Sequence, residues 1–315
     1  MLDRGIEAVL PFGPDSCLRR HDPISEETIV ELAAGFQAIV GASGARITRS
    51  VMEALPDLRI ISKLGIGYDV IDIDAATSLG IQVTNTPSLV EIDCVAEHAI
   101  ALMLAGAKRL NYYDTKRMAQ GGWLSEDTAS VALRGKTVGL VGFGRIGRAV
   151  ATRLQGWGLQ ILACDLPDRQ SPSPGVRFVE MSELLAESDF VSLHVSTSLG
   201  AAPVIGRSEL ASMKPSAVLV NTARGANIDQ QALFEALKDG QLLAAALDVY
   251  VQEPPPLGEP LFTLENVIAT PHLGASAPEA EADMEAMAAD NIQQVFDGQI
   301  PATLLNPDSL RHARK

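Results

Sequence analysis

The glycine pattern GFGRIG at residues 142–147 limits the folds open to this chain more than any other feature of its sequence. It follows the apolar run Thr137–Val141 and precedes a helical pattern that continues to Gln155, so it lies between a predicted strand and a predicted helix. In that context the first glycine permits a tight turn, the second lets a pyrophosphate approach the backbone, and the third lets helix and strand pack closely. The pattern therefore predicts a dinucleotide-binding unit, with the amides of Arg145 and Ile146 facing phosphate.

Asp165 supports this interpretation. It ends the predicted strand Ile161–Cys164 and follows the glycines at roughly the 20-residue spacing of an acidic residue that binds ribose. A carboxylate there accepts hydrogen bonds from both ribose hydroxyls and repels a 2′-phosphate, which favours NAD over NADP. Arg169 lies close enough in the sequence to moderate that preference. The alternative, glycines that serve only a tight turn, is disfavoured by the acidic partner.

Apolar strands alternate with helical stretches along the chain, as a parallel sheet with covered faces requires. The 315 residues are enough for two domains. We expect a doubly wound parallel-sheet Rossmann domain at residues 89–274, and a smaller flavodoxin-like α/β substrate domain made of residues 1–88 and 275–315. A long helical pattern from Val90 to Met118, and another from Pro278 to Phe296, would connect the two domains.

Composition excludes several classes of function. The 25 Lys and Arg residues against 39 Asp and Glu give a net charge of −14, which repels nucleic acid and anionic membranes. Cys17, Cys94 and Cys164 form no close pair for a disulfide framework or a zinc site. The sequence shows neither an export signal nor an apolar run of the ~20 residues that span a bilayer. We therefore predict a soluble cytoplasmic protein with a small-molecule substrate, no metal, no nucleic-acid partner and no membrane contact.

Arg224, Glu253 and His272 each follow a predicted strand. The loops at strand carboxyl ends form the ligand crevice of an open α/β sheet, so these side chains are expected to converge. Their chemistry suits hydride transfer to a 2-oxo acid: Arg224 binds the carboxylate and polarises the carbonyl, and His272 gives its proton to the developing alkoxide. Glu253 would orient the imidazole. His98, in an apolar helix, is interpreted as a helix-packing or hinge residue, and His194 as lining the cofactor crevice.

Further motifs occur in a fixed order around these residues: GIGYD at 65–69, MKP at 213–215, NTARG at 221–225, DVYVQEP at 248–254 and PHLGAS at 271–276. Together with GFGRIG they resemble the D-isomer-specific 2-hydroxyacid dehydrogenases, the family of phosphoglycerate dehydrogenase and hydroxypyruvate reductase. The resemblance covers nearly the whole chain. It implies an NAD(H)-dependent oxidoreductase that interconverts a 2-oxo acid and its D-2-hydroxy acid, and a homodimer built through the cofactor domain.

The resemblance also implies roles for individual residues. Arg224, Glu253 and His272 would form the catalytic triad, with His272 as proton donor. Asp248 would contact the nicotinamide amide. The implied cofactor-binding set is Gly142, Gly144, Arg145, Ile146, Gly147, Asp165, Val195, Thr222, Ala223, Arg224, Asp248, His272, Gly274 and Ala275. The implied substrate-binding set is Gly65, Ile66, Gly67, Arg224 and His272, with the amides of Ile66 and Gly67 meeting the substrate carboxylate.

The substrate stays open among glyoxylate, hydroxypyruvate, phosphohydroxypyruvate and bulkier 2-oxo acids. Residues 41–43 are Gly-Ala-Ser where phosphoglycerate dehydrogenases commonly carry an arginine, which weakens the case for a phosphorylated substrate. Arg46, Arg49 and Lys63 nevertheless keep an anionic distal group open. Formate dehydrogenases typically pair the histidine with glutamine, so Glu253 disfavours that activity.

Relatives in this family often begin with a strand and a helix ahead of the segment matching Arg4–Glu7. We therefore expect the first domain to be shorter by roughly 15 residues, and no C-terminal regulatory domain. The alternative function is an NADH-sensing dimeric corepressor-like binding protein of the same fold, because fold alone does not decide between enzyme and sensor.

Overall fold

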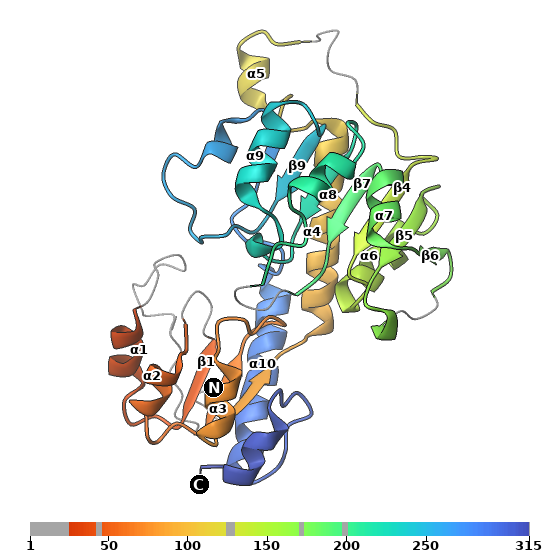
Figure 1. Ribbon diagram of the computed structural model, residues 1–315. Coiled ribbons are helices and arrows are strands. Elements are labelled where there is room, and N and C mark those ends of the chain that lie inside the picture. The colour runs from red at the N-terminus through yellow and green to blue at the C-terminus, as the bar shows by residue number, and fades with distance from the viewer. Residues whose placement is uncertain (1–24, 42–45, 124–129, 170–172, 197–200, 315) are drawn as a thin grey trace. The chain divides into compact units, whose positions relative to one another are not determined.

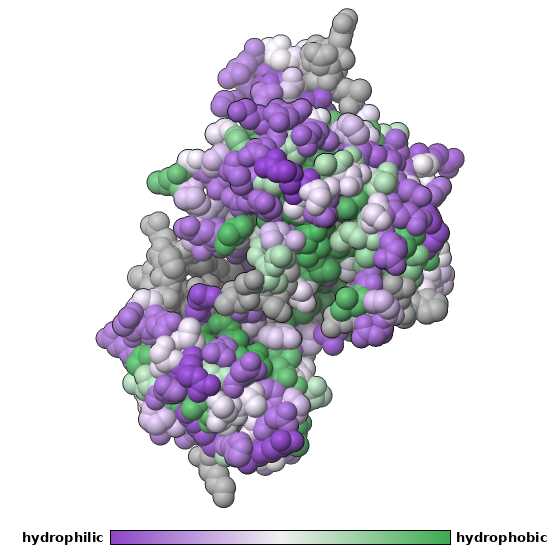
Figure 2. All heavy atoms as spheres, in the orientation of Figure 1, coloured by the Kyte–Doolittle hydropathy of each residue, from purple (hydrophilic) through white to green (hydrophobic). Residues whose placement is uncertain are grey.

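The computed structural model describes residues 25–41, 46–123, 130–169, 173–196 and 201–314 (Figure 1). The chain divides into two compact units, Met1–Glu91 with Ala277–Lys315, and Ile92–Ser276. The predicted features at Arg4–Glu7, Cys17, Ala42 and Ser43 lie outside the described residues. The visible surface of each unit is mostly hydrophilic, with hydrophobic residues gathered in smaller areas (Figure 2).

The larger unit is built on a seven-stranded parallel sheet with the order β10-β9-β8-β7-β4-β5-β6. Its strands are β4 (Thr137–Val141), β5 (Gln160–Cys164), β6 (Val176–Phe178), β7 (Phe190–Leu193), β8 (Val218–Asn221), β9 (Ala244–Leu247) and β10 (Val267–Ala269). Strands are added outward from β4 on both sides, which is the doubly wound Rossmann order with β10 as an additional edge strand. The predicted fold class is confirmed.

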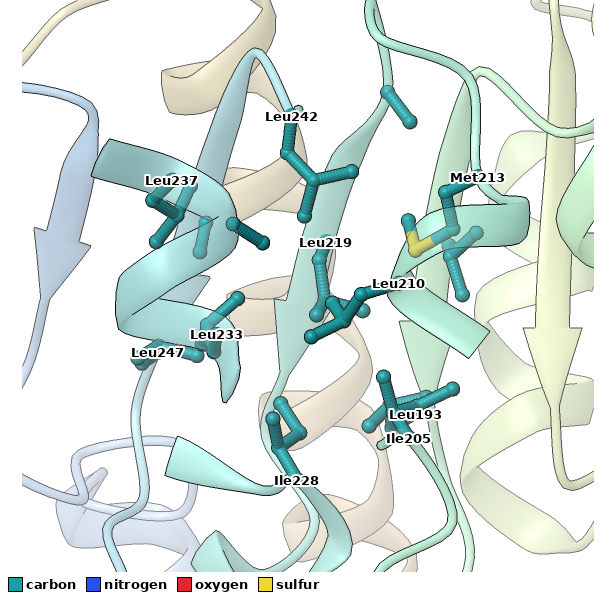
Figure 3. Packing of buried hydrophobic residues seen from close by; sticks show 14 of the residues in the cluster. Leu193, Ile205, Leu210, Met213, Leu219, Ile228, Leu233, Leu237, Leu242 and Leu247 are labelled. Carbon is teal, nitrogen blue, oxygen red and sulfur yellow. The ribbon is translucent and has the colours of Figure 1, made fainter. Parts of the chain in front are cut away.

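Helices cover both faces of this sheet because successive residues of a strand point to opposite faces. On β8, Val218 and Val220 pack with α4 (Leu89–Lys108) and α6 (Arg145–Leu154), which cover one face. Leu219 belongs to the cluster on the other face. The helices on that face are α7 (Met181–Glu187), α8 (Arg207–Ser212) and α9 (Gln230–Lys238). Figure 3 shows Leu219 between Leu233 of α9 and Leu210 of α8.

The helical pattern predicted from Val90 to Met118 is two helices, so the expectation of one continuous helix is wrong. Helix α4 ends at Lys108, and Arg109 follows in the left-handed conformation with φ 52°. A second helix, α5 (Thr115–Ala119), begins at the N-cap Asp114, whose carboxylate accepts a hydrogen bond from the Arg117 amide at 2.7 Å. Aspartate is favoured at an N-cap because its side chain satisfies an amide without an intrahelical partner. Figure 1 shows α5 beyond the ends of α4 and α9.

The smaller unit contains a three-stranded parallel sheet in the part of it that the structure describes. The strands β1 (Ala38–Gly41), β2 (Ile60–Lys63) and β3 (Gln82–Asn85) lie in that order. One face packs on α1 (Glu26–Ala33), α2 (Arg49–Glu53) and α3 (Ile73–Ser78), and the other on α10 (Pro278–Phe296). Short 3-10 helices of the two units lie at Pro167–Arg169, Gly225–Asn227, Pro260–Thr263 and Pro307–His312.

Leu219 gives a test of this core, because it is fully buried at the centre of the cluster in Figure 3. We expect Leu219→Ala to lower the free energy of unfolding of the larger unit by about 2–5 kcal/mol, through lost transfer energy and a residual cavity. The matched control is Leu257→Ala, whose leucine is fully exposed, with an expected change within about 0.5 kcal/mol. Thermal unfolding followed by circular dichroism measures both, and equal losses would contradict the packing described.

Candidate active site

The parallel register places most of the predicted site residues of the larger unit along one edge of its sheet. The last residues of six strands are paired across the sheet in the order Cys164, Val141, Leu193, Asn221, Leu247 and Ala269. The next residues along the chain are Asp165, Gly142, His194, Thr222, Asp248 and Thr270. Backbone hydrogen bonds continue into this row, since the Thr270 amide donates to the Leu247 carbonyl at 2.9 Å. Motifs far apart in the sequence therefore meet at the carboxyl ends of the strands.

The glycine turn after β4 has the geometry that a pyrophosphate needs. Gly142 has φ 92°, and a Cβ there would lie 2.6 Å from the His194 carbonyl oxygen. A Cβ on Gly147 would lie 2.3 Å from the Gly142 carbonyl oxygen. Helix α6 can therefore pack this closely against the turn only because residue 147 is glycine. A Cβ on Gly144 would meet nothing within 4 Å, which leaves the approach open. Gly144 is also the N-cap of α6 and has no side chain to occupy the amides of the first turn, which begins at Arg145.

Asp165 is fixed against this turn. Its Oδ2 accepts a hydrogen bond from the Phe143 amide at 2.7 Å, and its Oδ1 accepts one from the Leu166 amide at 2.8 Å. A carboxylate oxygen accepts more than one hydrogen bond, so both oxygens can also meet ribose hydroxyls. The side chain of Arg169, named from the sequence as a moderating cation, lies outside what the structure describes.

Two further groups in the row fit a dinucleotide. The hydroxyl oxygen of Thr222 is buried, and no hydrogen bond reaches it from the described residues. The same holds for Nε2 of His194, whose pKa is lowered by burial to about 4, so that the ring is neutral at pH 7. Val195 follows, and its carbonyl accepts a hydrogen bond from the Asn227 side chain at 3.0 Å. The glycine turn, the fixed carboxylate and these polar atoms together fit NAD, which this set of residues would hold.

Arg224 stands in a loop shaped by the last residue of β8. The Asn221 side chain accepts a hydrogen bond from the Ala223 amide at 3.0 Å and donates one to the Arg224 carbonyl at 2.8 Å. Gly225 comes next, and a Cβ there would lie 1.9 Å from the backbone carbon of Tyr250. Only glycine permits this approach, so the loops after β8 and β9 run side by side.

His272 and Glu253 form a direct pair, although they come from different loops. Nδ1 of His272 lies 2.7 Å from Oε2 of Glu253, and Oε1 of Glu253 accepts a hydrogen bond from the Tyr250 amide at 2.9 Å. Both side chains are partly exposed, at 50% and 37%. His272 has φ 53°, a conformation uncommon outside glycine. With Nδ1 engaged by the carboxylate, Nε2 is the nitrogen that we expect to serve a substrate.

Asp248 is a buried carboxylate that organises the loop after β10. Its Oδ1 accepts hydrogen bonds from the Thr270 hydroxyl at 2.5 Å and the Leu273 amide at 2.8 Å, and its Oδ2 accepts one from the Gly274 amide at 2.9 Å. Nε2 of His98 lies 3.2 Å from Oδ1. Burial alone raises the pKa of Asp248, but these hydrogen bonds outweigh it and hold the pKa below its ordinary value.

The predicted substrate loop belongs to the smaller unit. The Gly65 amide donates to the Thr86 hydroxyl at 2.8 Å, and the Ile66 amide donates to Oε1 of Glu91 at 3.1 Å. The family resemblance assigns the Ile66 amide to a substrate carboxylate. In this structure a carboxylate of the chain itself holds that amide.

The cations named as possible contacts for a distal anion also belong to the smaller unit. Arg49 forms an ion pair with Glu53 at 3.5 Å and donates a hydrogen bond to the Ser78 hydroxyl at 3.1 Å. Lys63 is buried and donates to the carbonyl of Leu64. Arg49 and Lys63 thus have partners within their own unit.

Sequence reasoning did not identify four residues that shape the site, namely Asn221, Tyr250, Thr270 and Glu91. Asn221, Tyr250 and Thr270 stand inside or beside the quoted motifs, and that position was the available signal.

Across the described residues, none of the helices combines the length and apolar character needed to cross a bilayer. Within the same residues, no group of three His, Cys, Asp or Glu side chains is placed to hold a metal ion.

Comparison with known proteins gives a consistent result. Residues 100–274 match the family model described as D-isomer specific 2-hydroxyacid dehydrogenase, NAD binding domain. A glyoxylate reductase from Korarchaeum cryptofilum is 40% identical over 295 residues, which cover 92% of this chain and 88% of the relative. A D-3-phosphoglycerate dehydrogenase from Methanocaldococcus jannaschii is 40% identical over 286 residues, and the match spans 90% of this chain but only 54% of that longer protein.

A solved structure agrees with the sequence relatives. The crystal structure of a glyoxylate reductase from Paecilomyes thermophila has a TM-score of 0.79 and 32% identity, covering 89% of this chain and 88% of that one. These relatives are named as oxidoreductases. Their names do not favour the alternative that this chain is a corepressor-like NADH sensor. The chain belongs to the D-isomer specific 2-hydroxyacid dehydrogenase family and is an NAD-dependent oxidoreductase.

Proposed function

We propose that this chain reduces a small, unphosphorylated 2-oxo acid of the glyoxylate or hydroxypyruvate type with NADH, and catalyses the reverse oxidation. The product is the 2-hydroxy acid, of D configuration where it is chiral. The observation that carries the proposal is the His272–Glu253 pair, 2.7 Å apart, on the same sheet edge as Arg224 and the glycine turn. Relatives named glyoxylate reductase and hydroxypyruvate reductase support the substrate class. The Gly-Ala-Ser sequence at 41–43, where phosphoglycerate dehydrogenases commonly carry an arginine, favours a substrate without a phosphate group.

Each residue of the trio has a distinct part in the reaction. When bound, NADH supplies the hydride that adds to the carbonyl carbon. Arg224 binds the substrate carboxylate and polarises the carbonyl through its planar guanidinium. His272 gives a proton from Nε2 to the carbonyl oxygen as negative charge develops there, so that a hydroxyl is formed. Glu253 holds Nδ1 and stabilises the protonated imidazole before the transfer.

We further assign the two compact units to two tasks. The larger unit would bind NAD, and the smaller unit would bind the substrate carboxylate through the loop Gly65, Ile66 and Gly67. In this assignment the substrate takes over the Ile66 amide from Glu91, exchanging one carboxylate acceptor for another. For these two tasks we propose the domains 1–88 with 275–315 and 89–274, whose boundaries lie two or three residues from those of the compact units.

The proposed reaction is tested by following NADH oxidation with a panel of 2-oxo acids: glyoxylate, hydroxypyruvate, phosphohydroxypyruvate, pyruvate and a bulkier branched acid. We expect the highest kcat/KM with glyoxylate or hydroxypyruvate. A clear preference for phosphohydroxypyruvate would overturn the substrate class, and absence of turnover with every acid would overturn the proposed activity.

His272→Asn tests the proton donor. Asparagine tolerates the left-handed backbone that His272 adopts, so the loop is retained while the acid is lost. We expect kcat to fall by about 10²–10⁴-fold, the usual contribution of a general acid. NADH affinity, measured by fluorescence, should change little. The exposed His312 gives the control His312→Asn, which should keep full activity; comparable activity in the two variants would exclude His272 as the donor.

Asp165→Ser tests the preference for NAD. Loss of the carboxylate removes charge-assisted hydrogen bonds to ribose and the repulsion of a 2′-phosphate, so the ratio of kcat/KM for NADH over NADPH should fall about ten-fold or more. Asp168→Ser, at an exposed position three residues further on, is the matched control and should leave the ratio unchanged. A ratio unaffected by Asp165→Ser would mean that another group selects the cofactor.

We infer that the protein is a homodimer assembled through the larger unit. Support comes from large apolar side chains exposed around α5, with Leu110 at 58%, Met118 at 43% and Trp123 at 73% exposed. Sedimentation velocity should give twice the chain mass of 33.4 kDa, and Trp123→Glu should shift the protein toward that of one chain. A wild-type protein that sediments as one chain would contradict the inference.

We also propose a cytoplasmic location. In the part of the chain that the structure describes, Cys164 forms no disulfide bond, which fits a reducing compartment. Fractionation of the source cells, with antibody detection, tests this location directly, and recovery in an exported fraction would contradict it.

A further inference from the structure

We propose that His98 is a positioning residue for His272: from helix α4, it holds the loop after β10 in place through Asp248 and Thr270. The proposal rests on the proposed function only for its catalytic consequence. The structural part concerns contacts within the larger unit.

His98 reaches two members of the loop network with a single nitrogen. Its Nε2 lies 3.2 Å from Oδ1 of Asp248 and 3.0 Å from the Thr270 hydroxyl oxygen. The Thr270 hydroxyl itself donates to Oδ1 of Asp248 at 2.5 Å. Because Thr270 uses its hydrogen on the carboxylate, the Nε2–H of His98 is the donor in both remaining contacts.

The hydrogen-bond donors to the Asp248 carboxylate come from the loop after β10 and from helix α4, and His98 is the donor on α4. The Thr270 hydroxyl and the amides of Leu273 and Gly274 all belong to the loop after β10. His98 belongs to α4, whose residues Ala96 and Ala99 are buried against the sheet. His98 therefore connects a loop and a carboxylate to a helix that is already fixed by the hydrophobic core.

His272 depends on this network through its backbone. Its amide donates to the Asp248 carbonyl at 2.8 Å and to the Thr270 carbonyl at 3.1 Å. Its φ of 53° is a sparsely populated conformation that surrounding contacts must maintain. If the loop relaxes, the imidazole leaves the position in which Nδ1 lies 2.7 Å from Glu253. A displacement of about 1 Å at a reacting group costs on the order of 10²-fold in rate.

The neighbouring residue Glu97, on the same helix, does not take part in the contacts that His98 makes with Asp248 and Thr270. Glu97 is exposed and lies 3.3 Å from Arg153 of α6, away from the loop network. Substitution at Glu97 thus changes a charged side chain on α4 without touching Asp248 or Thr270. Glutamine at position 98 keeps an Nε2–H donor of similar reach, whereas leucine keeps similar bulk and removes the donor.

The first experiment measures hydrogen exchange of the backbone amides of Thr270, His272, Leu273 and Gly274, without substrate, in the wild type and in His98→Leu, His98→Gln and Glu97→Gln. We expect exchange in this segment to be at least ten-fold faster in His98→Leu, because the loop loses its connection to α4. His98→Gln should stay within about three-fold of the wild type, and Glu97→Gln should equal it. Equal exchange in His98→Leu and the wild type overturns the proposal.

The second experiment measures kcat and KM with NADH and the preferred 2-oxo acid. His98→Leu should lower kcat by ten-fold or more, with KM for NADH changed less than three-fold, and His98→Gln should recover most of kcat. Leu102→Ala, in a buried position of the same helix, controls for lost stability. If Leu102→Ala lowers the melting temperature as much as His98→Leu and also lowers kcat as much, the effect is general destabilisation and the positioning role is overturned.

The two experiments separate this proposal from the proposed function. Hydrogen exchange reports the loop in a protein that has turned over no substrate, so absence of activity with every 2-oxo acid leaves that result fully interpretable. Faster exchange in His98→Leu together with unchanged kcat would overturn the link from the loop to His272.

Discussion

The parallel register of six strand ends is the constraint on which the rest of this site depends. Because Val141, Leu193, Asn221, Leu247 and neighbouring strand ends are aligned, the residue that follows each of them enters the same row. A shift of one residue in any strand would turn its apolar side chains to the wrong face, where a different cluster of helices packs. The hydrophobic core therefore fixes the register, and the register fixes where the residues that follow the strands appear.

The loops of the site are further held by carboxylates that accept hydrogen bonds from backbone amides. Asp165 fixes the glycine turn, Glu253 binds the Tyr250 amide, and Asp248 binds the amides of Leu273 and Gly274. A buried or half-buried charge is costly unless donors surround it, so each carboxylate stabilises the loop that supplies its donors. These carboxylates therefore fix the conformation of the loops around the site.

Much of this arrangement could be predicted from the sequence. The glycine motif, Asp165 and the strand pattern identified the Rossmann sheet, because local spacing determines those features. The placement of Arg224, Glu253 and His272 after strands also followed from the pattern, since strand carboxyl ends meet at one edge. The break between α4 and α5 was missed because the apolar helical period outweighed the Asp114 capping signal. The contacts of His98 with Thr270 and of Ile66 with Glu91 were missed because side-chain partners far apart in sequence depend on tertiary packing, which no periodicity reports.

Exposure separates the two kinds of residue in this site. His272 is half-exposed and Glu253 more than one-third exposed, whereas Asp248 is almost fully buried at 1%. A group that exchanges a proton with a substrate has to be reachable, and a reachable side chain has few neighbours to hold it. Its precision must then come from the backbone that carries it, and that backbone is fixed by buried groups behind it. For half-exposed His272 those buried groups are Asp248 and its donors, which hold the loop that carries the imidazole.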